Sequence, residues 1–444
     1  MMRSLLVFGL VIAFQVSQAQ EEITLGQVVA LALERNYDVL AARNLSEGAK
    51  TDDRYAFGAF IPRINAVGST VWNSNNQQLE FQDEARNNSG KAESNNIAAS
   101  AQLQWTLFDG TRMFATRERI AAIAAQGEML VKDQMVNTIA SVATNYFDIV
   151  RQKQQLRAIE EQMAVSEVRV ELAERRLAVG MGAKPELLQA KVDYNEQRTQ
   201  VMQQEALIAQ LKEQLNGAVG LQLPSQYDVA DTIIIDLDMR REEISNNIDN
   251  TSYALQLSRQ EIGISSLALR ERKAEILPFL DFNASYNFSR TDNTLLINPF
   301  APVFNQSDGY NYGLTLNVPI LNGFNQRRLV QQARINVRRQ QILYDQQKAN
   351  VTVGLERAFV IYDNAKKILL VEEENISFAK ENVSIALETF KRGATTFVEL
   401  RTAQQSLADA YTRLINARYL AKLAEIELLR LNGGLLPDAP ADGQ

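Results

Sequence analysis

The sequence predicts an α+β fold that combines strands of alternating polarity with very long helices. Three observations lead to this prediction. The chain repeats itself at a constant spacing, its strand segments alternate apolar and polar residues, and its longest segments carry an apolar residue at every seventh position. With only 9 prolines and 21 glycines in 444 residues, the chain also contains few residues that interrupt helices.

The composition excludes several classes of function. Histidine and cysteine are both absent, which rules out disulfides, thiolate or imidazole metal sites and any mechanism that needs a histidine base. The formal net charge of −7 does not suggest a basic surface for binding nucleic acid. No spacing of the remaining Asp, Ser or Tyr residues suggests catalysis. We therefore expect no catalytic residues, no metal, no cofactor and no nucleic-acid partner.

The first residues resemble a secretion signal. Arg3 is followed by an apolar run from Leu5 to Phe14 and by Ser17 and Ala19, so we predict a signal peptide at 1–19. The alternative is a membrane anchor, but the run is too short to cross a bilayer. No cysteine follows the cleavage site, so we expect no lipid at the mature N-terminus. Because no other run of about 18 apolar residues occurs, insertion into a membrane would have to use strands.

The chain contains an internal repeat. Leu107-Phe108-Asp109-Gly110 returns as Ile320-Leu321-Asn322-Gly323, a spacing of 213 residues (320 − 107). Gly180 and Glu186 return at the same spacing as Gly393 and Glu399. Pro224 interrupts the helical pattern between the two copies. The predicted parts are a first repeat at 20–220, a linker at 221–240, a second repeat at 241–434 and a disordered tail at 435–444.

Each repeat contains a helix, two strands separated by a polar loop, a very long helix and a return helix. The predicted strands lie near 61–74, 96–108, 277–290 and 310–321. In the third strand Leu280, Phe282 and Tyr286 alternate with Asp281 and Asn283. Such alternation is expected of a two-faced strand, which has one apolar and one polar side. The first strand alternates poorly and is predicted mostly from its place in the repeat.

The long helices are predicted at 111–179 and 324–392, and the return helices at 184–216 and 397–432. The first long helix would contain 69 residues (179 − 111 + 1) and extend about 100 Å at 1.5 Å per residue. Apolar residues recur at every seventh position in both long helices, and alternating leucine and alanine seams run along the second return helix. A sustained period of seven predicts left-handed coiled coils.

Two-faced strands in a secreted chain have two interpretations. One is a soluble sandwich, and the other is a transmembrane barrel that is apolar outside and polar inside. The strand lengths, the polar segments Asn73–Asn96 and Thr291–Gly309, and the position of Trp72 and Trp105 on strands as membrane-interface anchors favour the barrel. Four strands cannot close a barrel, and open edges are not tolerated in lipid, so several chains would have to share one sheet.

These features resemble the TolC family of outer-membrane efflux proteins over nearly the whole chain. The resemblance rests on Ile23–Asn36 as an opening helix, Ile61-Pro62-Arg63 and Leu277-Pro278 before strands, the two repeated strand-to-helix motifs, and Gly180 and Gly393 at hairpin tips. It implies a homotrimer in the Gram-negative outer membrane, with a composite 12-stranded barrel made from four strands per chain. This barrel would continue into a periplasmic helical barrel of twelve helices.

The resemblance also implies a function and partners. The trimer would be the passive channel of a tripartite efflux or type I secretion system, joined by a periplasmic adaptor (membrane fusion) protein to an inner-membrane RND or ABC transporter. Outer-membrane lipid would surround it, and the subunit would be no enzyme. The alternative is a secreted trimeric coiled-coil scaffold without a channel. A membrane-barrel hydrolase is disfavoured, because no histidine is present to act as base.

The resemblance further suggests site residues at the hairpin tips. Glu186 and Glu399 match family positions that face a closed periplasmic gate, although glutamate is also favoured in any first helical turn by the helix dipole. Thr395 and Thr402 depart from the family pattern, which makes Lys184 a candidate partner in the gate. The adaptor is expected to contact the tips at Arg176, Leu177, Val179, Gly180, Met181, Phe390, Arg392, Gly393, Ala394 and Phe397.

Overall fold

The computed structural model describes residues 21–221, 223–224, 227–298 and 300–436. They form two compact units, which we call the helical unit and the sheet unit. The helical unit comprises Met1–Ala41, Lys132–Ser252 and Val351–Gln444, and the sheet unit comprises Ala42–Val131 and Tyr253–Asn350. The predicted signal peptide at 1–19 lies outside the described residues. No helix among these residues is both long and apolar enough to cross a membrane.

The four longest helices lie where the seven-residue pattern predicts them. They are α3 (Arg112–Ala178), α4 (Lys184–Ala218), α8 (Asn325–Lys391) and α9 (Phe397–Asn432). The seventh-position residues of α8 become its buried side within the helical unit, including Leu355, Tyr362 and Phe390. Alanines of α9, such as Ala403 and Ala410, are also buried, and Ala424 packs in one cluster with Leu355 and Tyr362, since a small side chain lets helices approach closely.

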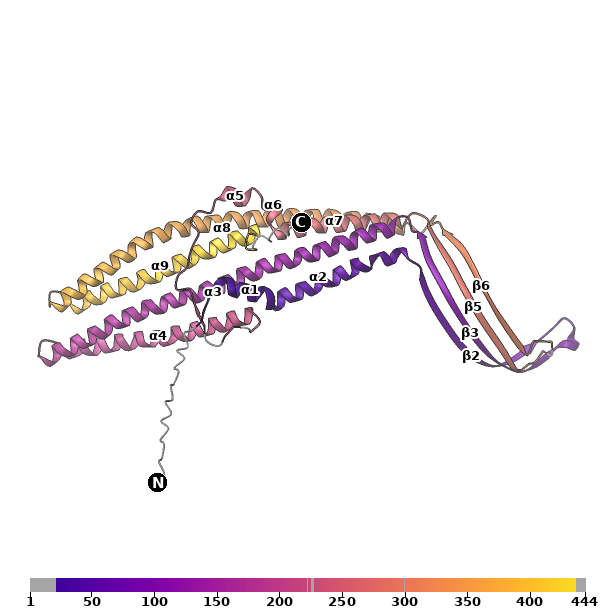
Figure 1. Ribbon diagram of the computed structural model, residues 1–444, viewed down its shortest axis with the longest axis horizontal. Helices are drawn as coiled ribbons and strands as arrows, with labels where there is room; N and C mark the ends of the chain where they lie inside the picture. The colour runs from indigo at the N-terminus through magenta and orange to yellow at the C-terminus, as the bar shows by residue number, and fades with distance from the viewer. Residues whose placement is uncertain (1–20, 222, 225–226, 299, 437–444) are drawn as a thin grey trace, which may run out of the picture. The chain divides into compact units, whose positions relative to one another are not determined.

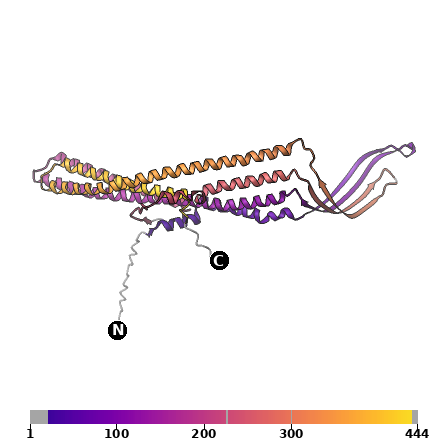
Figure 2. The same cartoon turned by 90° about the horizontal axis from the view of Figure 1, so that it is seen from above.

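In the helical unit these helices lie side by side in the order α4, α3, α9, α8 (Figures 1 and 2). Gln204 on α4 donates to Gln152 on α3, at 2.7 Å between the side chains. Tyr411 on α9 donates to Glu161 on α3, and Arg413 on α9 bonds Glu372 on α8. The hairpin of the first repeat therefore packs against the hairpin of the second through α3 and α9.

The predicted linker is a structured part of the helical unit. Residues Tyr227–Val229 form β4, which pairs in parallel with β1 (Glu21–Ile23). Tyr146 of α3 fixes this pair, because its hydroxyl donates to the Ile23 carbonyl and accepts from the Ala230 amide. The sequence did not predict this small sheet, since three-residue strands carry no periodic signal. The remaining short helices of the unit are α1 (Leu25–Arg35), α5 (Arg241–Ser245) and α6 (Ile248–Thr251).

The predicted disordered tail requires a correction at its start. Leu435 packs against the largest buried cluster of the helical unit, which contains Tyr146, Leu215 and Tyr227. Gly433 ends α9 in a left-handed conformation and returns the chain toward that cluster. The prediction of a tail from 435 is therefore wrong for this residue, and residues 437–444 lie outside the described ones.

The sheet unit contains one antiparallel sheet with the strand order β2-β3-β5-β6. Its strands are β2 (Arg63–Leu79), β3 (Asn88–Phe108), β5 (Phe279–Leu295) and β6 (Phe304–Asn317). Two short 3-10 helices flank β2, at Ala56–Phe60 and Glu84–Arg86. The strands lie beside one another in both views (Figures 1 and 2).

The strand bounds differ from the predicted ones at both ends. The pairs run on from Asn73↔Ser94 to Leu79↔Asn88, through residues predicted to be a loop. Backbone pairing needs no apolar face, and polar side chains such as Asn73 and Ser94 bond each other across it. At the other end, β6 stops at Asn317 because Pro319 has no amide hydrogen for the ladder.

Helices of the sheet unit follow the order of the strands. The part of α2 (Tyr37–Tyr55) after Ala41 packs on α3, α3 packs on α7 (Tyr253–Ala274), and α7 packs on α8. These contacts include Lys50–Glu128 at 2.6 Å, Arg119–Glu271 at 2.8 Å and Asn336–Ser265 at 3.4 Å. Within this unit the helices α2, α3, α7 and α8 therefore neighbour one another in the same order as the strands β2, β3, β5 and β6.

Candidate functional site

The two hairpin tips have the same backbone geometry. Gly180 and Gly393 have φ values of 75° and 72°, a left-handed conformation that glycine adopts without a steric penalty. In the first tip the Met181 amide donates to the Arg176 carbonyl, and in the second the Ala394 amide donates to the Thr389 carbonyl, at 2.9 Å each. These bonds close the last helical turn and reverse the chain.

The two predicted gate glutamates make different contacts. Glu186 faces Arg176 across the first hairpin, with 3.9 Å between the charged atoms and about a fifth of its side chain exposed. Within the described residues Arg176, rather than Lys184, is therefore its ion-pair partner. The same guanidinium lies over the ring of Phe390, 5.4 Å from its centre. Arg176 thus connects the first tip to the second.

Glu399 caps its own helix. Its carboxylate accepts from the Thr396 amide at 3.0 Å, and the Thr396 hydroxyl accepts from the Glu399 amide. Hydrogen bonds from the Thr395 hydroxyl and then from the Thr396 amide lower the pKa of Glu399. This is the helix-start role that the sequence left open as the alternative to a gate. Its side chain is nevertheless exposed, so its charge faces solvent in this chain.

Most of the predicted adaptor-contact residues are accessible. The exposed ones are Val179, Gly180, Met181, Arg392, Gly393 and Ala394, whereas Arg176, Leu177 and Phe397 are half-buried. The predicted adaptor contact of Phe390 has to be corrected, because its side chain is only 2% exposed and packs beneath Arg176. Its ring occupies a seam position of α8, where the seven-residue period places it inside the hairpin.

A buried ionic cluster behind the tips was missed by the sequence analysis. Arg169 on α3 is 2% exposed, bonds Asp193 on α4 at 2.6 Å and Gln404 on α9 at 3.0 Å, and lies over the ring of Phe397. Arg401 pairs with the same aspartate at 3.4 Å. Burial lowers the pKa of Arg169, Asp193 opposes this effect, and Arg401 adds to it. Neither Arg169 nor Asp193 lies at a seventh-position residue of the pattern, so the period gave no signal for this cluster.

The sheet has one apolar and one polar face. Paired residues lie on the same face, so the register places Trp105, Phe282 and Leu314 together on the apolar one. Thr106 and Asp281 lie on the opposite face, where the threonine hydroxyl donates to the carboxylate at 2.7 Å. Further polar bonds on that face join Asn283 to Thr315 and Ser285 to Asn311.

Both tryptophans lie on the apolar face. Trp72 pairs with Asn95, which is ten residues before Trp105 on β3 (105 − 95). At about 3.3 Å per residue the two rings are separated by roughly 33 Å along the strands. Trp72 is 73% exposed, and Trp105 is 38% exposed and donates its ring N–H to the Phe60 carbonyl.

The sheet has two unpaired edges, one along each outer strand. Strands β2 and β6 each have a partner on one side only, among the residues that the structure describes. On β6 the side chains of Tyr310, Tyr312 and Leu314 are all more than 60% exposed. An open edge with exposed apolar residues is a surface that another chain can cover.

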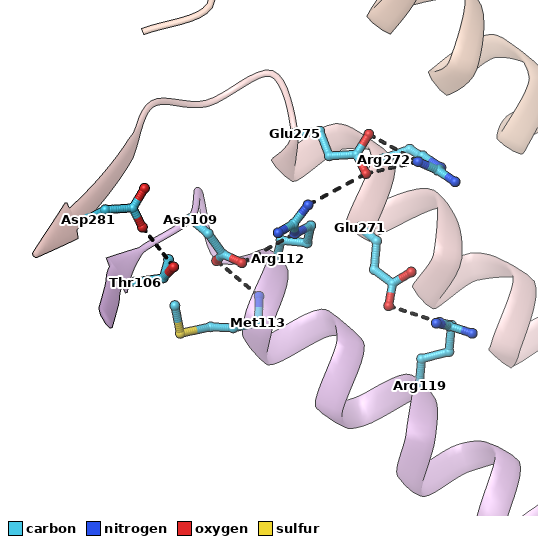
Figure 3. A network of polar contacts seen from close by, with 9 residues as sticks. All are labelled: Thr106, Asp109, Arg112, Met113, Arg119, Glu271, Arg272, Glu275 and Asp281. Atoms are coloured by element: carbon cyan, nitrogen blue, oxygen red, sulfur yellow. Dashed lines mark hydrogen bonds and ion pairs between the residues drawn. The ribbon is translucent and has the colours of Figure 1, made fainter. Parts of the chain in front are cut away.

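Charged side chains tie the sheet to the helices at the first strand-to-helix junction (Figure 3). Asp109 accepts from the Met113 amide at 3.0 Å and so caps the first turn of α3. Arg112 bridges Asp109 and Glu275 at the end of α7. Gly110 is left-handed and its backbone is so close to Ala274 that no side chain fits.

The sequence model of the family described as "Outer membrane efflux protein" matches residues 28–221 and 246–434. The chain belongs to this family. The resemblance found from the repeated motifs is thereby confirmed, and so is the function it implied, that of an outer-membrane efflux channel. The family is one of channels and not of enzymes.

Curated relatives of this efflux protein cover most of its length. The chain is 19% identical to the cation efflux system protein CusC of Escherichia coli K12 over 92% of its residues and 86% of CusC. It is 21% identical to outer membrane protein TolC of Vibrio cholerae, over 89% of this chain and 87% of TolC. These coverages show that both repeats, and not one domain, take part in the similarity.

A solved structure shows the same fold. The Campylobacter jejuni CmeC outer membrane channel superimposes on 94% of this chain and 87% of its own, with a TM-score of 0.78 and 15% identity. The predicted α+β fold class of this efflux protein is confirmed. At this identity the likeness concerns the fold alone.

Proposed function

We propose that three copies of this efflux protein share one sheet. Strand β6 of one copy pairs with β2 of the next, which closes a 12-stranded barrel with four strands from each chain. The observation that carries the proposal is the open, two-faced sheet, because an open edge is not tolerated in lipid. The apolar face would contact lipid and the polar face would line the channel.

The positions of the tryptophans support this assembly. Strands of such barrels tilt by about 35–45°, so a separation of roughly 33 Å along the strand corresponds to about 25 Å along the membrane normal. This is about the height of the apolar band of outer-membrane barrels. Trp72 and Trp105 would then anchor the two membrane interfaces.

Conductance and mass test the proposed channel. Protein purified in detergent should have the mass of a trimer and should give discrete conductance steps in planar bilayers. A stable water-soluble monomer, or a trimer that never conducts, would contradict the proposal. The second outcome would favour the alternative of a secreted coiled-coil scaffold.

We further propose that the long helices form a twelve-helix barrel in the periplasm of a Gram-negative cell. The protein would arrive through its signal peptide at 1–19 and carry no N-terminal lipid. Its tips would meet a periplasmic adaptor that connects it to an inner-membrane RND or ABC transporter. The channel itself would be a passive conduit without catalysis.

The exposed tip residues are proposed to contact the adaptor. A photo-crosslinker placed at Met181 or Ala394 should capture a co-expressed adaptor in vivo, since both side chains are exposed at the turns. A crosslinker at Val353, which is 67% exposed but lies on α8 far from the tip in sequence, is the control. Equal capture from all three positions, or none, would contradict the assignment.

The gate is proposed to contain Glu186 and Glu399. Three chains would bring six carboxylates together around the opening, and cations would be attracted there. Glu399→Gln should weaken block of the single-channel current by a multivalent cation, because glutamine keeps the helix cap but removes the charge. Glu381→Gln, at an exposed position of α8, is the control. Unchanged block in Glu399→Gln would remove this residue from the gate.

A further inference from the structure

A cationic groove lies beside the first turns of α8 in the sheet unit. It has a volume of about 430 Å³, and its apolar lining residues are Ile276, Val330 and Ile335. Three guanidinium groups line it, those of Arg327, Arg334 and Arg338. We call this feature the arginine groove.

The arginines of the groove lack acidic partners. Arg327 lies over the ring of Phe324, and no ion pair joins Arg334 or Arg338 to any described residue. Neighbouring arginines of the same unit behave differently, since Arg119 pairs with Glu271 and Arg270 with Glu118. The groove therefore brings together arginines that have no acidic partner among the described residues.

The wider segment is also basic. Residues 325–350 contain five arginines and one lysine but a single acid, Asp345, in a chain whose net charge is −7. Asp345 lies two helical turns beyond Arg338 and does not line the groove. The groove thus combines three cationic residues with apolar side chains, without a neutralising carboxylate among its lining residues.

The groove is distinct from the pocket at the polar face of the sheet. Leu277, Phe279 and Asp281 line a separate pocket together with Gln104 and Thr106 of the polar face. Ile276, one residue before Leu277, lines the arginine groove instead. The two neighbouring residues therefore line different pockets, and Ile276 lies beside the arginines of α8.

An exposed apolar segment separates the groove from β6. Ile320 is 92% exposed, Leu321 is 79% exposed and Phe324 is 64% exposed. The chain therefore passes from a strand with an apolar face, through exposed apolar residues, to unpaired arginines. This succession is what the boundary between hydrocarbon and charged headgroups favours.

We propose that the arginine groove binds the phosphodiester headgroup of an anionic phospholipid, with an acyl chain along Ile276, Val330 and Ile335. The guanidinium fork matches phosphate oxygens, and the apolar lining residues match a hydrocarbon chain. This inference rests on the proposed function, because the groove lies at headgroup depth only if the sheet spans the membrane.

Lipid-dependent stability tests the site. The delipidated oligomer is titrated with dioleoyl phosphatidylglycerol or with zwitterionic dioleoyl phosphatidylcholine in mixed micelles, and its thermal unfolding is followed. Wild type should be stabilised preferentially by phosphatidylglycerol, and Arg334→Gln/Arg338→Gln should bind it about 30-fold more weakly. Arg357→Gln/Lys367→Gln removes two exposed charges from α8 in the helical unit and should behave as wild type.

Two results of that titration would overturn the proposal. One is an equal response to the two lipids, and the other is an unchanged preference in Arg334→Gln/Arg338→Gln. Inorganic phosphate serves as a further probe. If it stabilises wild type as strongly as phosphatidylglycerol, the groove is a phosphate site and not a lipid site.

A crosslink identifies the occupant directly. The chain has no cysteine, so Ile335→Cys provides a single attachment point for a benzophenone maleimide. Irradiation in phosphatidylglycerol vesicles should add the mass of one lipid to the polypeptide. A crosslink to a second copy of the chain would overturn the proposal, because the groove would then be a subunit interface.

Conductance separates this inference from the function on which it rests. The same wild-type preparation is recorded in planar bilayers. If it conducts but shows no preference for the anionic lipid, only the lipid site is wrong. If it does not conduct, the proposed channel is wrong as well.

Discussion

The two repeats of the chain have the same elements, but equivalent positions have different surroundings. Arg169 and Asp193 of the first repeat form a buried ion pair, whereas the residues 213 positions later are Asn382 and Ser406. Gly180 and Gly393, by contrast, make the same turn. The comparison teaches that the repeat preserves the backbone geometry of the turns, while the Arg169–Asp193 pair is not repeated.

The largest expected effect is at the ion pair that only the first repeat contains. Arg169→Met should destabilise the protein by about 3–5 kcal/mol, because Asp193 loses its buried partner and keeps only the more distant and exposed Arg401. Guanidinium unfolding followed by circular dichroism measures this loss. Asn382→Met, at the equivalent exposed position, should change stability by less than about 0.5 kcal/mol.

A double variant sharpens this result. Arg169→Met/Asp193→Leu removes both buried charges and should recover most of the lost stability, since the cost arises from a buried carboxylate that has lost its buried partner. If the double variant is as unstable as Arg169→Met alone, packing rather than charge accounts for the effect.

The second largest effect is expected from glycine substitutions at the two strand-to-helix junctions, which should cost different amounts of stability. Gly110→Ala should cost about 2–4 kcal/mol, because φ is +71° and the added carbon would lie 2.4 Å from the Ala274 carbonyl oxygen. Gly323→Ala should cost only about 1–2 kcal/mol, since φ is +63° but the surrounding space is open. Equal losses in the two variants would show that backbone conformation alone decides both junctions.

The smallest effect concerns pH at the second tip. The pKa of Glu399 is lowered by the Thr395 hydroxyl and by Thr396, so its contribution to stability is present above its ordinary value of 4.5. This contribution should be lost as the pH falls through the lowered value. The amides at the start of α9 should therefore stay protected from hydrogen exchange, relative to the unfolded chain, at pH values somewhat below 4.5.

A matched variant checks this pH dependence. Thr395→Val removes the hydroxyl that contributes most to the shift, so protection of the same amides should be lost at a higher pH than in wild type. If the two pH profiles coincide, the Thr395 hydrogen bond does not set the ionisation of Glu399.

Part of the site could be predicted from residue patterns. Gly180, Gly393 and the four long helices follow from local signals, a left-handed turn and a period of seven. Glu399 shows the limit, because a first-turn glutamate and a gate residue look identical in one sequence. Phe390 was predicted to contact the adaptor, but its place in the seven-residue series of α8 leaves it buried within this chain.

The sequence by itself determined the two repeats, the long coiled-coil helices and the two-faced strands, because each depends on a period of neighbouring residues. The tertiary structure decided which distant residues meet. It pairs β1 with β4, joins Arg169 to Gln404 and leaves the arginines beside Ile276 unpaired. Such contacts arise from packing between segments far apart in the chain, which no local period encodes.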